Sequence, residues 1–239
     1  MIMDLMSAFE GKKRRKLISI LADGMGGQSR GEVASKIGAR ILATELQRFL
    51  GDTDMNEEKY YDLLVRAFSV ANWHILRYSE MHPEAEGMGT TISLAVIDEN
   101  QQLYIGNVGD SRVYIVNREE GAIQLTKDHT FVQELIDKGK ITKEQARHHP
   151  KKNILNQAVG TFADLKVDTC SLRLDDNDYV LLCCDGLTNH VSDDEMAEIV
   201  LNSNASPQEA CDRLVTLANK RGGKDNISVI IAPAVLIKA

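Results

Sequence analysis

The sequence lacks the features that mark nucleic-acid-binding and membrane proteins. Its formal net charge is −7 at pH 7 and its pI is about 5.4, which argues against a long nucleic-acid-binding groove. It has no apolar run near the roughly 20 residues that a membrane helix needs, and no recognisable signal peptide at its start. We therefore expect a cytoplasmic protein that binds neither nucleic acid nor membranes.

Cysteine is scarce, and its spacing excludes common zinc sites. The four cysteines, at 170, 183, 184 and 211, include no CxxC pair. Cys183 and Cys184 are adjacent in an apolar run, where a disulfide between them would be strained. No basic loop surrounds them that would stabilise a thiolate. We expect four reduced thiols, with the adjacent pair buried in a strand.

Linkers and internal repeats are also absent, so a single domain over residues 1–239 is expected. Spacings typical of helices and of strands alternate along the chain. Helical spacing covers residues 31–50, 60–78, 193–201 and 207–220. Strand-like segments cover residues 17–22, 90–97, 101–108, 111–117, 122–126, 166–174, 178–184 and 226–237.

Three of these regions carry more specific predictions. Tight turns separate the four strand-like segments of residues 90–126, which predicts an antiparallel meander. Residues 128–160 are polar with short helical pieces, and are predicted to form a flap outside the core. Trp73 is expected in the core together with its helical neighbours. The predicted apolar face of that helix consists of Leu64, Ala67, Phe68, Ala71 and Ile75.

Four aspartates occupy positions where predicted strands end or turns begin. They are Asp23 in LADGMGG, Asp110 in NVGDSRVY, Asp185 in LLCCDGLT and Asp225 in GGKDNISV. Each alone is weak evidence, because Asp-Gly is a common turn pair. A carboxylate against a buried strand must, however, be paired, hydrogen-bonded or bound to a cation, and nearby basic residues are too few to pair all four. Carboxylate and carbonyl oxygens favour Mg²⁺ or Mn²⁺, so the sequence predicts a binuclear metal site.

Seven ordered motifs carry a family resemblance. They are ADGMGGQSRGEVAS, GMGTT, NVGDSRVY, QLTKDHT, HPKKNILNQAVGT, DYVLLCCDGLT and KDNISV. In order and spacing, over residues 17–232, the chain resembles the metal-dependent Ser/Thr protein phosphatases of type 2C in their compact bacterial form. The resemblance implies an α+β fold, an α-β-β-α sandwich of two mostly antiparallel sheets flanked by helices, with a metal cluster at one edge.

The resemblance also implies a role for each matching residue. Asp23 is similar to the carboxylate that bridges two metals, and the Gly24 carbonyl to a ligand of one of them. Asp185 and Asp225 resemble ligands of the second metal, and Asp110 resembles the residue that holds a weaker third metal together with Asp185. The expected cofactor is Mn²⁺ or Mg²⁺, as two ions with a weaker third, and Asp23, Asp185 and Asp225 form the expected catalytic centre.

Neighbouring residues are expected to shape this site. Ser111 and Arg112 would form the turn after Asp110, and Asn226 would support Asp225 through hydrogen bonds. The glycines at 26 and 27 would let the backbone turn beside the cations, and the one at 31 would open the following helix.

The expected chemistry follows from the charges. Two cations about 4 Å apart can share one water, lower its pKa and direct the resulting hydroxide at phosphorus. This predicts direct hydrolysis of phosphoserine and phosphothreonine, without a covalent phosphoenzyme. By analogy with the family, the partners are phosphorylated proteins and the enzyme, expected as a monomer, opposes a Ser/Thr kinase.

The sequence departs from the family near its start. Members ordinarily carry an arginine and an acid pair there, in a segment like RxxNED, and MIMDLMSAFEGKKRRKLISI contains none. Asp4 is a candidate replacement ligand, but a surface or disordered terminus is the favoured interpretation. Arg14 and Arg15 are candidates for phosphate binding, but a solvated turn is favoured. The residue that binds the substrate phosphate is left open.

A second departure concerns the proton donor for the leaving group. Several members place a histidine after the first Asp-Gly, where this chain has Met25. His129, His148 and His149 flank the predicted flap, and a structural or surface role is favoured for each. Two alternative functions stay open: a catalytically impaired phosphatase-like binding module, because of the missing motif, and a metal-dependent hydrolase of small phosphate esters.

Overall fold

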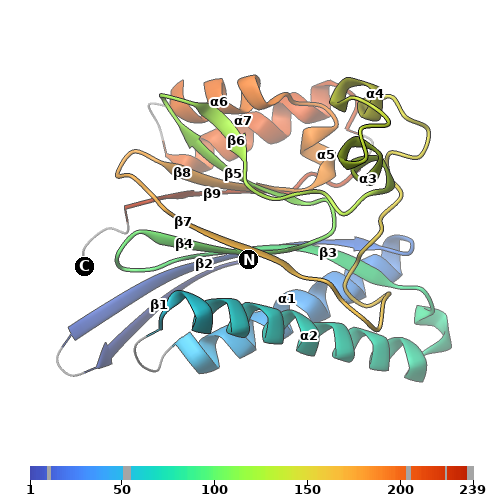
Figure 1. Ribbon diagram of the computed structural model, residues 1–239, viewed down its shortest axis with the longest axis horizontal. Helices are drawn as coiled ribbons and strands as arrows, with labels where there is room; N and C mark the ends of the chain where they lie inside the picture. Colours follow the sequence, from blue (N-terminus) through green and yellow to red (C-terminus); the bar gives the residue numbers. More distant parts are fainter. Residues whose placement is uncertain (10–11, 51–54, 203–205, 224, 236–239) are drawn as a thin grey trace.

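The computed structural model describes the chain except for residues 10–11, 51–54, 203–205, 224 and 236–239. Two β-sheets lie face to face, with α1 and α2 on one outer side and α6 and α7 on the other (Figure 1). The predicted α-β-β-α sandwich is confirmed. Among the described helices, none is both long enough and apolar enough to cross a membrane.

The elements follow the predicted alternation of strands and helices. The strands are β1 (Ile2–Phe9), β2 (Lys12–Met25), β3 (Gly89–Ile97), β4 (Gln102–Val108), β5 (Arg112–Asn117), β6 (Gly121–Gln124), β7 (Asp168–Arg173), β8 (Tyr179–Cys183) and β9 (Val229–Pro233). The helices are α1 (Gln28–Leu50), α2 (Glu57–Met81), η1 (Pro83–Ala85), α3 (Phe131–Asp137), α4 (Lys143–Arg147), α5 (Asp185–Thr188), α6 (Asp193–Asn202) and α7 (Pro207–Lys220).

Every neighbouring pair of strands is antiparallel, but the predicted single meander is wrong. One sheet has the order β1-β2-β3-β4-β7 and the other β6-β5-β8-β9. β3 pairs with β4 and β5 with β6, while the chain crosses from one sheet to the other between Val108 and Arg112. The crossing lets β5 pair with β8, and it places Ile105 and Val113 in the core between the sheets.

Three apolar cores separate the four layers, and strand alternation supplies them. Successive side chains of a strand point to opposite faces. Ile92 and Leu94 of β3 therefore pack toward α1 and α2, while Ala95 packs between the sheets. Leu182 of β8 likewise lies between the sheets, and Leu181 packs toward α6 and α7. A strand buried on both faces tends to read as a continuous apolar run, as residues 179–184 do. β3 is buried along its whole length although it also carries threonine and serine.

The predicted apolar face of α2 is confirmed, but the expectation for Trp73 is wrong. Leu64, Ala67, Phe68, Ala71 and Ile75 are all buried. The Trp73 side chain is 56% exposed and touches His74 edge-on. At 3.6 residues per turn, residue 73 lies on the side of the helix opposite to the buried face.

The start of the chain is an ordered hairpin rather than a loose terminus. β1 pairs with β2 along its length, with Asp4 opposite Leu17. Arg15 lies within β2 and not in the predicted turn. Strand pairing satisfies the backbone hydrogen bonds that a disordered terminus would give to water.

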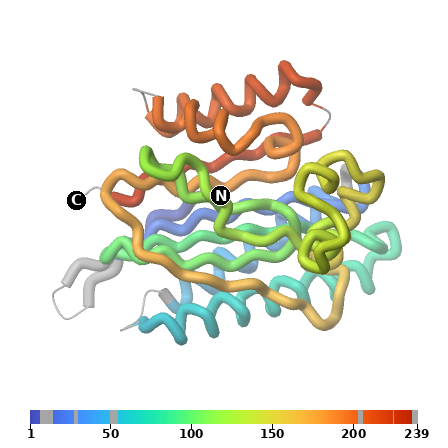
Figure 2. Tube along the Cα trace, turned by 45° about the horizontal axis from the view of Figure 1, so that its top comes forward, coloured from blue at the N-terminus to red at the C-terminus, as the bar shows by residue number. Residues whose placement is uncertain are grey.

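Residues 128–160 stand beside the sandwich, outside both sheets (Figure 2). They contain only the short helices α3 and α4. Two isolated bridges, Thr130 with Leu155 and Thr90 with Val159, join the segment to itself and to β3. Asn72 of α2 accepts from the Gly160 N–H over 2.6 Å and donates to the Phe162 carbonyl over 2.8 Å. Hydrogen bonds therefore connect the two ends of the segment to each other and its C-terminal end to β3 and α2.

Candidate functional site

Asp23 lies near the end of β2, opposite Thr91 of β3. Its carbonyl accepts a hydrogen bond from the Thr90 hydroxyl over 2.8 Å. Burial, and after it the charges of Asp185 and Asp225, raise the pKa of its carboxyl to about 6. An acid whose ionisation is opposed in this way favours a nearby cation.

Glycines allow the strand end and the next helix to meet at this point. A Cβ on Gly24 would lie 1.9 Å from the Gly31 carbonyl oxygen, and one on Gly31 would lie 2.6 Å from the Gly24 carbonyl oxygen. Gly26 and Gly27 have φ values of +104° and +92°, as the predicted tight turn requires. Gly31 does not open the helix, because α1 begins at Gln28. It is instead the point at which α1 touches β2.

Asp185 begins α5, and only the N-cap residue Cys184 separates it from the end of β8. A carboxylate oxygen of Asp23, a carboxylate oxygen of Asp185 and Sγ of Cys184 lie within 4.8 Å of one another. Burial raises the pKa of Asp185, and the charge of Asp225 contributes to the rise. Asp23 comes from the five-stranded sheet and Asp185 from the four-stranded one, so the two sheets meet at this cluster.

Cys184 ties Asp185 to the loop of Asp225, a contact that the sequence did not predict. Its Sγ accepts from the Ser228 N–H and donates to the Asn226 carbonyl, both over 3.2 Å. Burial raises the pKa of the thiol to about 11, with the charges of Asp23 and Asp185 adding to the shift. Cys184 is therefore a protonated, buried thiol.

Asp225 lies in the exposed loop before β9. Its Oδ1 accepts from the Asn226 backbone N–H over 2.8 Å, so the expected support from Asn226 comes through the main chain. A Cβ on Gly186 would lie 2.2 Å from the Asn226 carbonyl oxygen. This close approach brings the loop against the start of α5.

Asp110 occupies the crossing between β4 and β5. Burial, and after it the charges of Asp185, Asp128 and Asp23, raise the pKa of its carboxyl to about 7. The hydroxyls of Ser111 and Thr91 lie 2.7 Å apart, and Arg112 forms an ion pair with Asp128. Ser111 lies in the turn as expected, while Arg112 is the first residue of β5 and borders the turn.

One lysine of the 128–160 segment reaches toward the cluster. Nζ of Lys152 donates to Oδ1 of Asn189 over 2.8 Å, and Nδ2 of Asn189 donates to Oδ2 of Asp185 over 3.2 Å. The positive charge of Lys152 lowers the pKa of Asp185, against the larger effect of burial. The predicted flap is thereby linked to one of the predicted ligands.

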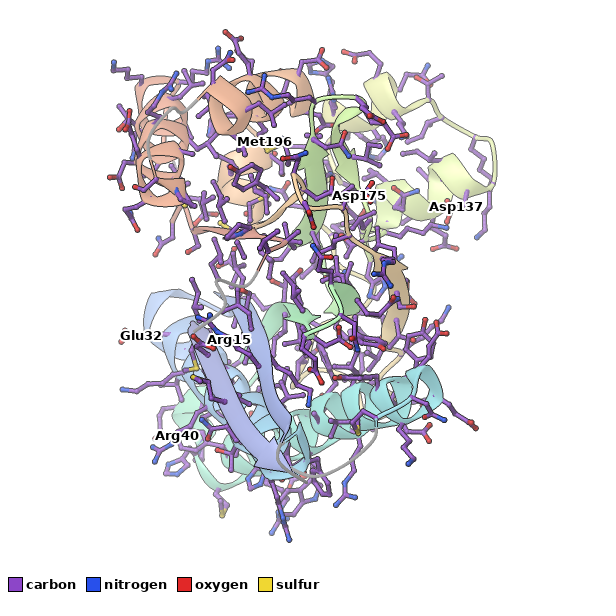
Figure 3. All side chains as sticks on the ribbon, turned by 90° about the vertical axis from the view of Figure 1, so that its left-hand side faces the viewer. Arg15, Glu32, Arg40, Asp137, Asp175 and Met196 are labelled. Atoms are coloured by element: carbon purple, nitrogen blue, oxygen red, sulfur yellow. The ribbon has the colours of Figure 1, made fainter. Side chains whose placement is uncertain are left out.

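The candidates near the start of the chain lie on the β1–β2 hairpin. Arg15 lies on β2, where Figure 3 labels it. It donates from Nε and a terminal nitrogen to the Asp4 carboxylate, at distances of 2.6 to 3.1 Å. This partner lowers the pKa of Asp4. The structure thus pairs these two candidates with each other. The side chain of Arg14 lies outside the described residues.

The other sequence candidates have local contacts. Met25 follows Gly24 and offers no proton. His148 is an exposed side chain that contacts Glu144, and Nδ1 of His149 accepts from the Lys151 N–H. His129, in contrast, contacts the turn that carries Asp110.

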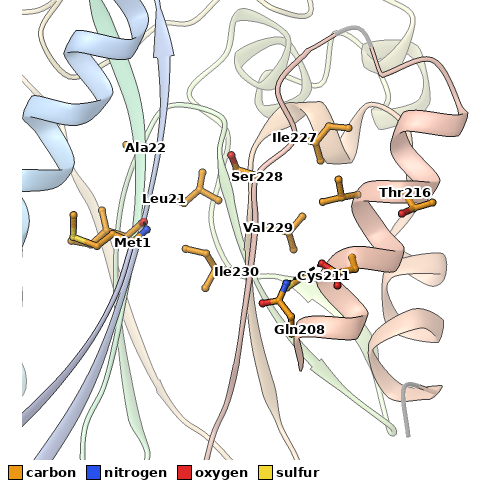
Figure 4. Close-up of a pocket in the computed structure, with 13 residues that line it drawn as sticks. Met1, Leu21, Ala22, Gln208, Cys211, Thr216, Ile227, Ser228, Val229 and Ile230 are labelled. Carbon is orange, nitrogen blue, oxygen red and sulfur yellow. Dashed lines mark hydrogen bonds between the residues drawn. The ribbon is translucent and has the colours of Figure 1, made fainter. Parts of the chain in front are cut away.

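A cavity lies beside the acids rather than around them. It measures about 650 Å³ and opens between β2, β9 and α7 (Figure 4). Leu21, Val229 and Ile230 are among its apolar lining residues. The acids themselves lie outside this lining, so the predicted chemistry belongs to the sheet edge.

The chain is similar to known proteins over most of its length. A family model described as "Protein phosphatase 2C" matches residues 4–221. The chain is 40% identical over 223 residues to the serine/threonine phosphatase stp of Listeria monocytogenes, covering 93% of this chain and 86% of that protein. The Streptococcus agalactiae serine/threonine phosphatase has a TM-score of 0.82 at 32% identity, covering 96% of this chain and 91% of that one. The catalytic domain of the phosphatase PstP, solved with two manganese ions, has a TM-score of 0.75 at 33% identity, over 96% and 90%.

Proposed function

This chain belongs to the protein phosphatase 2C family and is a protein-serine/threonine phosphatase, and on that premise we propose how its acid cluster works. Asp23, the Gly24 carbonyl, Asp185 and Asp225 hold two divalent cations, Mn²⁺ or Mg²⁺. Asp110 and Asp185 hold a weaker third. The observation that carries the proposal is the convergence of Asp23 and Asp185 from different sheets.

The residues at the cluster fit hard divalent cations. Burial and mutual repulsion raise the pKa values of Asp23, Asp110 and Asp185, and a bound cation would relieve both effects. All the proposed donors are oxygens, which Mn²⁺ and Mg²⁺ prefer. Cys184, the sulfur at the cluster, is engaged by the Ser228 N–H and the Asn226 carbonyl, and these hard cations favour the oxygens beside it over a soft sulfur ligand.

Each residue of the cluster then has a task of its own. Bound cations would supply Lewis acidity, which lowers the pKa of a water and offsets phosphoryl charge. Asp23 presents its carboxylate from the five-stranded sheet, and Asp185 from the four-stranded one. Asn189 fixes one oxygen of Asp185 by a hydrogen bond. Because the acids are set in place by strand ends, they need little rearrangement when substrate arrives.

The structure of the thiol favours direct hydrolysis over a phosphocysteine route. A thiol with a pKa of about 11 is protonated at neutral pH, and the thiolate is the nucleophilic form. Both hydrogen-bonding positions of Cys184 are occupied by the loop of residues 226–228. We assign this side chain a structural role, and water is the nucleophile of the proposed reaction.

The proposed substrates are phosphoserine and phosphothreonine in proteins. The names of the similar proteins support this class. We further propose that residues 1–239 act as one monomeric catalytic domain, that residues 128–160 form a flap beside the metal edge, and that the enzyme opposes a Ser/Thr kinase. The contact from Lys152 through Asn189 to Asp185 supports a role of the flap near the reacting groups.

An assay with matched variants tests the proposal. Hydrolysis of p-nitrophenyl phosphate and of a phosphothreonine peptide is measured with Mn²⁺ and after chelation. We expect turnover only with the metal, a loss of about 100-fold or more in Asp185→Asn, and less than about 10-fold in Cys184→Ser. Turnover in Asp185→Asn equal to that of the wild type would contradict the metal assignment.

The same assay separates the alternative functions. A binding module would bind the phosphopeptide without turnover above the Asp185→Asn background. A hydrolase of small esters would cleave phosphorylated metabolites faster than phosphopeptides. We expect the phosphothreonine peptide to be the better substrate, measured as kcat/KM.

A further inference from the structure

The turn that carries Asp110 is held by contacts that have no part in the proposed reaction. Gly109 has a φ of +107°, and a Cβ there would lie 2.4 Å from Cβ of Thr91. The neighbouring Asn107 side chain donates weakly to the Gly109 carbonyl, over 3.4 Å, and accepts from the Ser93 hydroxyl over 2.6 Å. The backbone conformation directly before Asp110 is therefore closely restricted.

His129, at the start of the 128–160 segment, binds both backbone groups of Gly109. The Gly109 N–H donates to Nδ1 of His129 over 3.3 Å, and the His129 N–H donates to the Gly109 carbonyl over 2.9 Å. On the other side of the ring, Nε2 lies 3.0 Å from Oδ2 of Asp168, the first residue of β7. The His129 side chain is only 10% exposed, so water competes little for these bonds.

These contacts select one form of the imidazole, assigned here from the hydrogen-bond network. Nδ1 accepts from the Gly109 N–H, so it carries no proton, and the ring proton lies on Nε2. From there it donates to the Asp168 carboxylate. A carboxylate in this position fixes both the tautomer and the orientation of a histidine. Asp168 therefore orients His129, and His129 holds Gly109.

The adjacent residue, Asp128, fixes the other end of the same turn. Arg112, two residues after Asp110, donates from Nε and a terminal nitrogen to the two oxygens of Asp128, over 2.8 and 2.7 Å. Such a bidentate pair sets orientation as well as distance. Asp128 and His129 thus hold the chain on both sides of Asp110.

His129 also joins the two ends of the 128–160 segment. Its carbonyl accepts from the Asn156 N–H over 2.8 Å, and the next residue, Thr130, bridges to Leu155. The same residue therefore contacts the Asp110 turn through its ring and backbone N–H, and the returning part of the segment through its carbonyl.

We propose that His129 is a positioning residue for Asp110, and that Asp168 acts through it. The proposal rests on the metal-binding role proposed above for Asp110. By holding Gly109, His129 sets the place of the Asp110 carboxylate and connects the binding of the third cation to the root of the 128–160 segment. Loss of the ring removes the acceptor of the Gly109 N–H, which loosens the turn and weakens that cation site, although every proposed ligand remains.

Amide hydrogen exchange on the metal-free full chain tests the contact itself. We expect the peptide that contains residues 107–112 to exchange at least about 10-fold faster in His129→Ala than in the wild type, because the Gly109 N–H loses its acceptor. His148→Ala is the matched control, since it removes an exposed histidine of the same segment that contacts Glu144. It leaves the exchange of residues 107–112 unchanged.

Calorimetric titration with Mn²⁺ tests the consequence. One Mn²⁺-binding event is expected to be lost in Asp110→Asn. The Mn²⁺ affinity of that same event should fall by about 10- to 100-fold in His129→Ala, the usual effect of removing a residue that supports a metal ligand. In the double variant of His129→Ala and Asp110→Asn, no loss beyond that of Asp110→Asn is expected. His129→Asn, whose amide oxygen can replace Nδ1, should recover part of the affinity.

The outcomes separate this inference from the proposed function. Wild-type exchange at 107–112 and a wild-type Mn²⁺ isotherm in folded His129→Ala would overturn it. If that variant does not fold, Asp168→Ala replaces it, with the same direction of change and a smaller size expected; unchanged exchange there also overturns the inference. A wild-type chain that binds no Mn²⁺ overturns the proposed metal site, while the exchange experiment still decides whether His129 holds the turn.

Discussion

At the scale of single residues, the acid cluster makes the metal-free protein sensitive to pH. The pKa of Asp23 rises from 3.8 to about 6 on folding, mainly through burial. The folded state therefore binds this proton more tightly than the unfolded state. The contribution of Asp23 to the free energy of unfolding is fully present below pH 3.8, falls as the pH rises through about 6, and stays lost above that value.

Replacing Asp23 by asparagine tests this linkage. In the presence of a chelator at about pH 7.5, we expect Asp23→Asn to be more stable than the wild type by about 1–2 kcal/mol, because the opposed charge is gone. At about pH 4 the two proteins should unfold at nearly the same temperature, since the wild-type carboxyl is then largely protonated. Thermal unfolding followed by circular dichroism measures both. An equal melting temperature at the higher pH would contradict the burial of an ionised acid.

Single residues were also where the sequence was most and least informative. Asp23 and Asp185 were found because each follows an apolar run and precedes glycine, a pattern visible within a few residues. The contacts of Cys184 with the 226–228 loop, and of His129 with Gly109, join segments that are far apart in the chain. No local pattern encodes which backbone group a side chain meets, although the position of Cys184 directly before Asp185 was an available signal.

At the scale of elements, the contact between β2 and α1 positions the Gly24 carbonyl. Gly24 and Gly31 approach so closely that neither position has space for a Cβ. The register of β2 against β3 then carries this fit to Asp23, which lies opposite Thr91. A change in α1 is therefore expected to reach the metal edge through backbone packing alone.

Gly31→Ala tests this transmission. The added methyl group would lie 2.6 Å from the Gly24 carbonyl oxygen, and relieving that overlap should cost about 1–3 kcal/mol. Gly87→Ala is the control, because it strains a residue at φ +75° without any atom within 4 Å of the new Cβ. We expect both variants to lose stability in chemical denaturation, and only Gly31→Ala to weaken Mn²⁺ binding. Equal Mn²⁺ affinity in the two would show that the helix contact does not position the carbonyl.

The elements themselves were largely predictable, and their partners were not. Spacing located both long helices and most strands, because apolar periodicity depends on neighbouring residues. The predicted meander was wrong at the step from β4 to β5, which lie in different sheets. β5 pairs instead with β8, which lies far along the chain. The hairpin of β1 and β2 was missed because KKRR reads as a solvated turn, while strand pairing places it inside β2.

At the scale of the whole molecule, three apolar cores hold four layers together. Ile75 belongs to the core between the helices α1 and α2 and the five-stranded sheet. A Cβ on Gly160 would lie 2.1 Å from Cγ2 of Ile75, so this side chain also packs against the end of the 128–160 segment. Trp73, two residues earlier on the same helix, points to solvent.

A pair of variants on α2 measures what this core contributes. Ile75→Ala is expected to lower the free energy of unfolding by about 2–5 kcal/mol, because it removes fully buried methyl groups and leaves a cavity. Trp73→Ala removes a larger side chain but is expected to change stability by less than about 1 kcal/mol, because the ring is exposed. Urea denaturation compares them. A larger loss in Trp73→Ala would mean that the tryptophan is covered in solution.

The resemblance to a known family supplied the sandwich and the edge location of the acids, which periodicity alone could not. The apolar run around Cys183 and Cys184 indicated a buried strand, without saying how many sheets share the core. The expectation for Trp73 failed for a related reason: a helix has one buried face, and a large aromatic residue on the other face has no layer to cover it.

Because the acids are divided between the two sheets, a misalignment of the sheets should affect the binding of divalent cations. Asp23 lies in the five-stranded sheet, while Asp185 and Asp225 lie next to strands of the four-stranded sheet. Asp110 lies where the chain crosses from one sheet to the other. Their mutual spacing therefore records the alignment of the two halves of the sandwich. A slight slip between the halves would disperse the oxygens while most hydrophobic contacts survived. Weakened affinity for divalent ions is accordingly the earliest symptom expected from a misaligned interior, ahead of any fall in melting temperature.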